Sequence, residues 1–167
     1  MRTTIACGAI SLVLLLLSST ASANEAYSQV DVGRRHADAQ AGYDAPAGIA
    51  RTESRVGNVS LGRGLAIGYG PNGISISHSI GVAGRHIGTA HNFQLTVGPN
   101  GTHVGRSGVV TTGGNTRVIA GGDTASGPGV PHGGNFATGY GRRIEAWSQS
   151  EVHARRASVH RNSRSRR

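Results

Sequence analysis

Three kinds of residue are scarce in this chain of 167 residues: lysine, cysteine and acidic residues. Lysine does not occur at all, and the single cysteine, Cys7, lies near the N-terminus. The rest of the chain therefore has neither disulfide bonds nor thiolate metal sites. A well-paired sheet, a bound metal or self-association must stabilise a small domain of this kind.

The scarcity of acidic residues argues against enzymatic chemistry. Residues 57–141 contain a single acid, Asp123, whereas glycoside hydrolysis needs two carboxylates. The nucleophile pattern G-x-S-x-G is absent. Residues 68–73 match G-x-G-x-x-G, but a strand-like run follows them where a dinucleotide site needs a helix. We therefore predict that the protein is not an enzyme and has no cofactor.

Four of the eight histidines, His78, His86, His91 and His103, lie in or beside strand-like runs. No two of them are spaced i, i+2, which would place both on one face of a strand, and carboxylate co-ligands are nearly absent. We interpret them as surface or strand-end histidines and predict no metal site. For His78, which falls among apolar positions, a buried hydrogen-bonded ring is the alternative.

The N-terminal residues have the pattern of a secretory signal peptide. Arg2 is positively charged, residues 10–17 form a short apolar run, and residues 21–23 are the small residues that precede cleavage. We predict a signal peptide over residues 1–23 and a secreted product, extracellular or periplasmic, that begins at Asn24. The apolar run is shorter than the ~20 residues of a membrane-spanning helix, so we predict no transmembrane span in the mature chain.

Composition divides the mature chain into four segments. Residues 24–56 are polar with little periodic apolar content, and we interpret them as a flexible leader. Residues 57–112 alternate apolar and small residues, which indicates a β-hairpin domain. Residues 113–141 are rich in Gly-Gly pairs and proline, as long loops are. Residues 142–167 form an arginine-rich tail.

Two identical turns organise the β-hairpin domain. Gly-Pro-Asn-Gly occurs at residues 70–73 and again at residues 98–101, and Asn-Gly between alternating runs is a strong hairpin signal. Proline fixes φ just before the bend. We therefore expect two hairpins that turn at Asn-Gly. The turn-forming residues are Pro71, Asn72, Gly73, Pro99, Asn100 and Gly101.

The apolar residues around the first turn fix the parity of its loop. They have odd numbers before the turn and even numbers after it, so they share one face only if the loop has an even number of residues. A two-residue Asn-Gly loop would pair Tyr69 with Ile76 and Leu65 with Ile80. The second turn has the same parity. The sequence thus predicts a mainly β fold, a small antiparallel meander of two hairpins with glycine-rich loops; a short β-solenoid is the alternative.

The other face of these hairpins carries only small or uncharged side chains. The simpler interpretation is a solvated face. The alternative is a flat face that stacks closely on another sheet, as glycine- and serine-rich faces do in silk, and through which copies of the chain would assemble. The residues of this face include Ser75, Ser77, Ser79, Asn92, Gln94 and Thr96.

The arginine-rich tail carries most of the positive charge. Ile144, Ser148 and Val152 fall on one helical stripe, so their spacing predicts a short helix over residues 143–160. Arginine binds phosphate, sulfate and carboxylate groups through paired hydrogen bonds, and we predict that the tail contacts polyanions. The arginines concerned are Arg142, Arg143, Arg155, Arg156, Arg161, Arg164, Arg166 and Arg167.

The leading hypothesis is therefore an exported, non-enzymatic surface or matrix protein that contacts an anionic polymer or an anionic membrane surface through its arginine-rich tail. Two alternatives use the same composition. One is a self-assembling glycine-rich structural protein, and the other is a basic glycine-rich antimicrobial protein. A tail that only keeps the chain soluble is a further interpretation.

Overall fold

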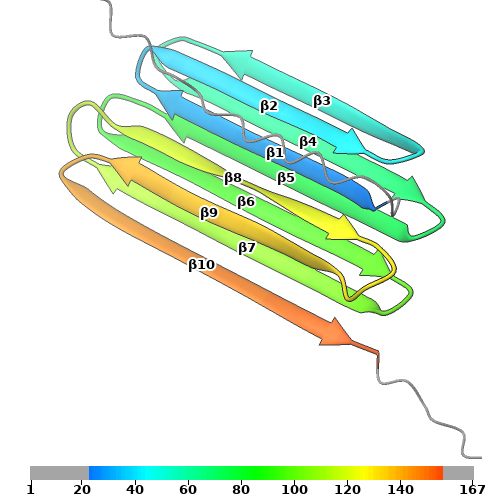
Figure 1. Ribbon diagram of the computed structural model, residues 1–167. Helices are drawn as coiled ribbons and strands as arrows, with labels where there is room; N and C mark the ends of the chain where they lie inside the picture. The colour runs from blue at the N-terminus through cyan, green and yellow to red at the C-terminus, as the bar shows by residue number, and fades with distance from the viewer. Residues whose placement is uncertain (1–22, 156–167) are drawn as a thin grey trace, which may run out of the picture.

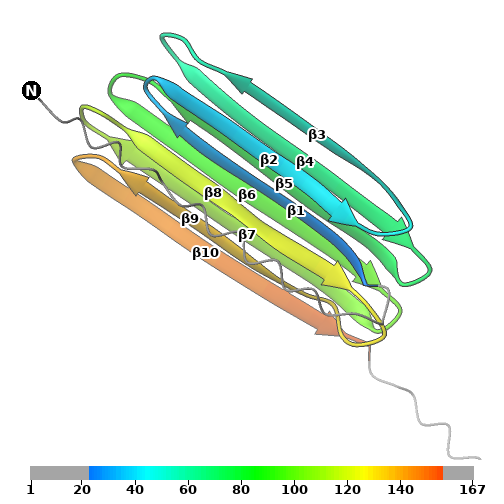
Figure 2. The ribbon, with the colours of Figure 1, turned by 45° about the horizontal axis from the view of Figure 1, so that its top comes forward.

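The computed structural model describes residues 23–155, which form two antiparallel sheets packed face to face (Figure 1). The four-stranded sheet lies along the length of the six-stranded sheet (Figure 2). Its order is β2 (His36–Asp44), β1 (Asn24–Gly33), β8 (Arg117–Ser126), β9 (His132–Tyr140). The six-stranded sheet has the order β10 (Arg143–Ala154), β7 (Gly101–Thr112), β6 (Ile87–Gly98), β5 (Gly73–Ala83), β4 (Ser60–Gly70), β3 (Ala47–Arg55).

The prediction of a mainly β meander is confirmed. Strands β3 to β7 follow one another as neighbours in the six-stranded sheet, and the two predicted hairpins are β4–β5 and β6–β7. Every one of these pairings is antiparallel. The β-solenoid alternative, which would stack successive repeats in parallel, is therefore wrong.

Both twin turns have two-residue loops, but each loop lies one residue earlier than predicted. Gly70 pairs with Gly73, so Pro71 and Asn72 form the first loop. Proline holds φ near −65°, which suits the first central position of a type I turn and excludes the positive φ of a type I′ turn. The positive φ, 115°, falls on Gly73 after the loop. The observed pairs include Tyr69 with Ile74, Leu65 with His78, and Gly98 with Gly101.

The segment predicted to be a flexible leader is ordered, because residues 24–56 contain β1, β2 and β3. In β1 the buried side chains alternate with exposed or half-buried ones, and they include Ala26, Ser28, Val30 and Val32. Half of these buried positions hold alanine or serine. A pattern search for large apolar residues therefore misses this strand.

The C-terminal segments also form strands. Residues 113–141, predicted to be loops, contain β8 and β9, and β10 replaces the predicted helix by pairing with β7 over its whole length. Ile144, Ser148 and Val152 are spaced by four, which fits one face of a helix and equally one face of a strand with its period of two. Residues 23–155 contain no helix long and apolar enough to cross a membrane. The predicted signal peptide up to residue 22, and the predicted tail beyond Arg155, lie outside the described residues.

The face of small and polar residues lies inside the sandwich, against the four-stranded sheet. Ser75, Ser77 and Ser79 are fully buried, whereas the isoleucines beside them on β5 are only partly covered. The interpretation as a solvated face is wrong, and close stacking is what occurs, with a sheet of the same chain as the partner. Assembly between copies therefore needs another surface.

The hydrophobic core is built from small residues. Its buried cluster lies toward the end of the sandwich where β1 passes to β2, and half-buried alanines of β2 and β9 pack against it. Among residues 23–155, no leucine, isoleucine, phenylalanine, tyrosine or tryptophan is buried. The cluster consists of Val30, Val32, Ala83, Ala90, Val109, Val118 and Ala120.

Glycine is required where the two sheets approach most closely. A methyl group on Gly64 would lie 2.6 Å from the carbonyl oxygen of Gln40, and one on Gly68 would lie 2.6 Å from that of Glu25. Both distances are shorter than the contact distance of carbon and oxygen, and both obstacles are backbone atoms. The glycines of β4 thus set the separation of the sheets.

Candidate binding surfaces

The structure separates the arginines of the predicted tail. Arg142 and Arg143 lie at the start of β10, whereas Arg155 follows its end and donates its N–H to the Asn100 carbonyl oxygen at 3.0 Å. Because twelve residues of extended strand span ~40 Å, the two groups lie at opposite ends of the sandwich. The other predicted residues, Arg156, Arg161, Arg164, Arg166 and Arg167, lie outside the described part of the chain.

Arginines from distant parts of the sequence gather at the end that carries Arg142. Five turns lie at this end, which is at the left of Figure 1. They are the turns β1–β2, β3–β4, β5–β6, β7–β8 and β9–β10. We define the basic end as the four turn arginines Arg34, Arg35, Arg85 and Arg142. All four are exposed, and the ion pairs found within residues 23–155 involve none of them.

Hydrogen bonds between neighbouring segments hold the backbone of these turns in place. Each turn either donates to or accepts from a segment outside it, so the bases of the arginine side chains are fixed relative to one another. The bonds run from Ser60 Oγ to the Arg34 oxygen (3.3 Å), from Thr116 Oγ1 to the Gly84 oxygen (2.9 Å), from Gly113 N to the His86 oxygen (2.8 Å) and from Arg142 N to the Thr112 oxygen (2.7 Å).

The predicted turn-forming residues lie at the opposite end of the sandwich. The first turn is joined to β1, since Asn24 Nδ2 donates to the Gly73 carbonyl oxygen at 2.9 Å. The second turn is joined to the β8–β9 loop, since Asn100 Nδ2 donates to the Pro128 carbonyl oxygen at 2.5 Å. Both turns therefore connect the two sheets as well as consecutive strands.

The outer face of the four-stranded sheet has the opposite charge. Arg117 and Asp31 form a paired contact across β1 and β8, with Nε 2.7 Å from Oδ1, and the hydrogen bond to Asp31 raises the pKa of Arg117. The remaining acids of this face project to solvent. Its five acidic residues are Glu25, Asp31, Asp38, Asp44 and Asp123, of the eight in the chain.

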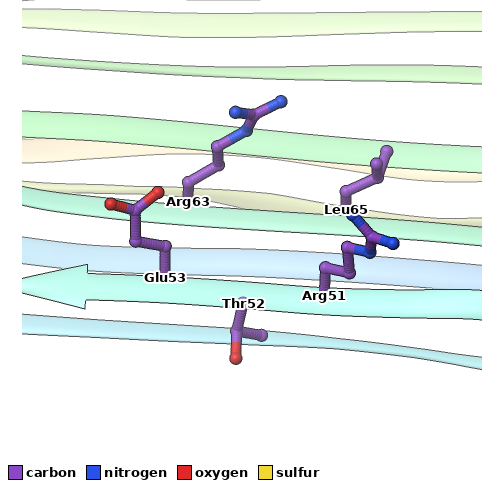
Figure 3. A pocket seen from close by; sticks show the side chains of 5 residues that line it. All are labelled: Arg51, Thr52, Glu53, Arg63 and Leu65. Atoms are coloured by element: carbon purple, nitrogen blue, oxygen red, sulfur yellow. The ribbon is translucent and has the colours of Figure 1, made fainter.

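The outer face of the six-stranded sheet combines apolar rows with charged side chains, and two shallow depressions lie on it. In the first, of about 270 Å³, Arg51, Glu53, Arg63 and Leu65 stand on one side of β3 and β4, and Thr52 points to the other side (Figure 3). The second lies between β7 and β10. Its lining residues are Val104, Arg106, Gln149 and Glu151.

Hydroxyl groups replace hydrophobic contacts over much of the interface between the sheets. The Ser28 hydroxyl is hydrogen-bonded to the hydroxyls of Ser77 at 2.9 Å and Ser79 at 2.8 Å. The Ser79 hydroxyl also accepts from Asn92 Nδ2 at 2.8 Å. Since buried polar groups destabilise a fold unless they are hydrogen-bonded, this network is what permits a serine-rich interior.

His103 belongs to this buried network, so the prediction of a surface or strand-end histidine is wrong for it. Its Nδ1 lies 3.2 Å from Thr124 Oγ1 and its Nε2 lies 2.9 Å from Ser150 Oγ. Burial lowers the pKa of His103, because a charged ring would lose its hydration. His78 is half-buried on the outer face of the six-stranded sheet. Within residues 23–155, no three metal-ligating side chains are grouped as a metal site.

No protein-family model, curated protein or solved structure matches this chain. Any assignment of function therefore depends on the charge and geometry of these surfaces.

Sequence reasoning missed Arg34, Arg35 and Arg85 as neighbours of Arg142. They lie in segments interpreted as a leader and as hairpins, and only the strand order brings them to one end. The available signal was their position: each falls in a short polar break between two alternating runs.

Proposed function

We propose that this protein is an exported, non-enzymatic surface or matrix protein that contacts polyanions through its arginines. The observation that carries the proposal is the basic end, where four exposed arginines without carboxylate partners stand on hydrogen-bonded turns. A guanidinium group binds sulfate, phosphate or carboxylate in a paired geometry. The signal-peptide pattern supports an extracellular or periplasmic polyanion.

The layout of the basic end suits a linear anionic polymer. Arg142 adjoins β10 and Arg85 adjoins β5, which are three strand spacings apart, or ~14 Å. Arg34 and Arg35 project from the other sheet. A flexible chain with repeated negative charges can meet several of these arginines together, whereas a single small anion meets one or two.

The tail beyond Arg155 supplies a second contact in this proposal. It begins at the end opposite the basic end, so the two regions are tested separately. Removing residues 142–167 would also remove β10 and uncover β7, which confounds the result. A chain that ends at Arg155 keeps all ten strands and lacks only the last five arginines.

The experiment is binding of a short heparin fragment to the purified protein over a range of salt concentrations. We expect the triple variant Arg35→Ser, Arg85→Ser, Arg142→Ser to weaken binding and to reduce the slope of log affinity against log salt by about 2–3, since each lost contact removes about 0.7–0.9. The matched control Arg51→Ser, Arg63→Ser, Arg106→Ser removes the same charge from the outer face of the six-stranded sheet and should keep the slope.

Two results would contradict the proposal. If both triple variants lose affinity equally, net charge rather than the basic end governs binding. If neither triple variant nor the chain ending at Arg155 differs from the unaltered protein, arginine contacts with polyanions are not its function.

A further inference from the structure

Many of the large apolar side chains of this protein lie on the outside of the six-stranded sheet. Phe93, Val97 and Tyr69 are 38%, 41% and 49% exposed, whereas the inner face of the same strands is buried. Contiguous apolar surface of this kind usually marks an interaction site. The outer face is also the face of this sheet that stays open to solvent, because the four-stranded sheet of the same chain covers the inner face.

One row of this outer face is aliphatic across five strands. The pairings place Val104 beside Leu95, Leu95 beside Ile76, Ile76 beside Ile67, and Ile67 beside Ile49. Neighbouring rows add further apolar residues. The row on one side includes Tyr69, Ile74 and Val97. The row on the other side includes Leu65 and Phe93, and two rows farther on are Leu61, Val82 and Val110.

We propose that this outer face binds the same face of a second copy of the chain, forming a dimer of four stacked sheets. The outer face as a whole covers five strand spacings by about ten residues, ~24 Å by ~33 Å, or ~800 Å², with the charged residues of β3 and β10 at its edges included. A stable interface buries about 800 Å² from each partner. The face is therefore large enough for a dimer.

The charges around the apolar rows favour one arrangement of the two copies. A twofold axis parallel to the strands sets β10 of one copy opposite β3 of the other, and β7 opposite β4. Glu145 and Arg55 occupy the same row at the two edges of the sheet, so they come face to face in the dimer. The depression at Arg51 then faces the depression at Glu151.

The same arrangement accommodates the bulky residues near the centre. Arg63 on β4 shares its row with Gly108 on β7, so the long side chain of one copy meets the His91 and Trp147 rings that lie over this glycine in the other. Trp147 lies over that glycine, with ring atoms 2.9 Å from where its Cβ would be, and offers its face to a guanidinium. A lipid surface fits less well, because Arg63 and Arg106 stand within the face.

The test is sedimentation equilibrium of the purified protein, expressed from its complete sequence. We expect a dimer, and we expect Ile76→Asp to weaken dimerisation ~30-fold or more, as for a central interface residue. The matched control is Ile119→Asp, a half-buried isoleucine on the outer face of the four-stranded sheet, which should leave the dimer intact.

Charge reversal keeps the test decisive if Ile76→Asp does not fold. Arg55 and Glu145 lie at opposite edges of one sheet, ~24 Å apart, so they interact only between copies. Arg55→Glu and Glu145→Arg should each weaken the dimer, and the double variant should restore it. Additive losses would overturn the arrangement.

Other outcomes overturn the second copy as the occupant. A weak, transient dimer has a dissociation constant of about 10⁻⁴ M. If the protein stays monomeric at a concentration of about 100 µM, it forms no such dimer. A monomer that binds phosphatidylglycerol vesicles, and loses this binding in Ile76→Asp, would assign the face to lipid. Polyanion binding at the basic end uses other residues, so either proposal can fail without the other.

Discussion

The two faces of the six-stranded sheet reverse the usual placement of polar and apolar side chains. On β5 the serines point into the sandwich, and the isoleucines beside them point outward. Hydrophobicity alone would place them the other way round. The comparison teaches that burial in this protein follows size and hydrogen bonding, with large apolar groups left for the outside.

The physical reason is the short distance between the two sheets. Glycine, alanine and serine allow the backbones to approach until the carbonyl oxygen of Gln40 lies near Gly64. At that separation a hydroxyl reaches a hydroxyl on the facing sheet, as Ser28 reaches Ser77 at 2.9 Å. Leucine or isoleucine does not fit at these positions, since protein interiors have no spare volume. The larger buried side chains Gln94 and His103 lie against Gly122 and Gly133 instead.

Two adjacent residues test this reversal most severely. Ser77→Arg places a charged, bulky side chain between the sheets and should lower the free energy of unfolding by at least about 4 kcal/mol, enough to unfold a domain of ordinary stability. Ile76→Arg on the outer face should cost about 1 kcal/mol in the monomer. Urea denaturation at low protein concentration measures both, and equal losses would contradict the assignment of the faces.

The spacing of the sheets gives the next largest effect. Gly64→Ala should lower the free energy of unfolding by about 2–3 kcal/mol, because the new methyl group meets a backbone oxygen that has nowhere to move. Gly114 lies in the β7–β8 turn with open space around it, so Gly114→Ala should stay within about 0.5 kcal/mol. A Gly64→Ala protein as stable as its control would mean that the sheets are farther apart.

The buried polar network predicts a dependence on pH. Burial lowers the pKa of His103 in the folded state below its ordinary value of 6.5, so the unfolded chain takes up a proton first as the pH falls. Stability should therefore be constant above pH 7 and should decrease below pH 6.5, by up to about 1.4 kcal/mol per pH unit for one such group. Denaturation of His103→Asn across pH 5–8 should show a shallower decrease.

His78 supplies the comparison from the outer face. Burial, and to a lesser extent the nearby Arg63, lower the pKa of His78. His78→Asn should remove its own share of the pH dependence and leave that of His103. If His78→Asn flattened the profile and His103→Asn did not, the polar interior would not be the source.

The smallest effect concerns the edge of the outer face. Trp147, the single tryptophan, covers Gly108 and lies with its ring centroid 6.3 Å from that of His91. Trp147→Ala should lower the free energy of unfolding by about 1 kcal/mol, and Trp147→Phe by less, because an aromatic ring over a strand glycine restores the missing packing. Thermal denaturation followed by circular dichroism compares the three proteins.

The hairpins could be predicted from the sequence because their large apolar residues alternate with small ones. The even loop length followed from the parity of Leu65, Tyr69 and Ile76, and the structure confirms it. The pairing register was wrong by two residues, which keeps the faces, because the φ that Pro71 imposes outweighs the preference of Asn-Gly for a type I′ turn.

The rest of the fold was hidden because its signals were weak or ambiguous. The strand β1 alternates through alanine and serine, which carry little hydrophobic contrast. In β10 the spacing of Ile144, Ser148 and Val152 is common to helix and strand. The basic end depends on which strands are neighbours, and no local pattern near Arg34 or Arg85 contains that information.

The pairing of β1 with β8 has a consequence for the time course of folding. Asp31 and Arg117, which join these strands, are 86 residues apart, whereas β3 to β7 can pair as each one follows the last. The N-terminal strand is synthesised first and acquires its central neighbour almost last, after a long loop has closed. Until then the serines of β5 face water, because the six-stranded sheet is nearly complete before the four-stranded sheet covers its inner face.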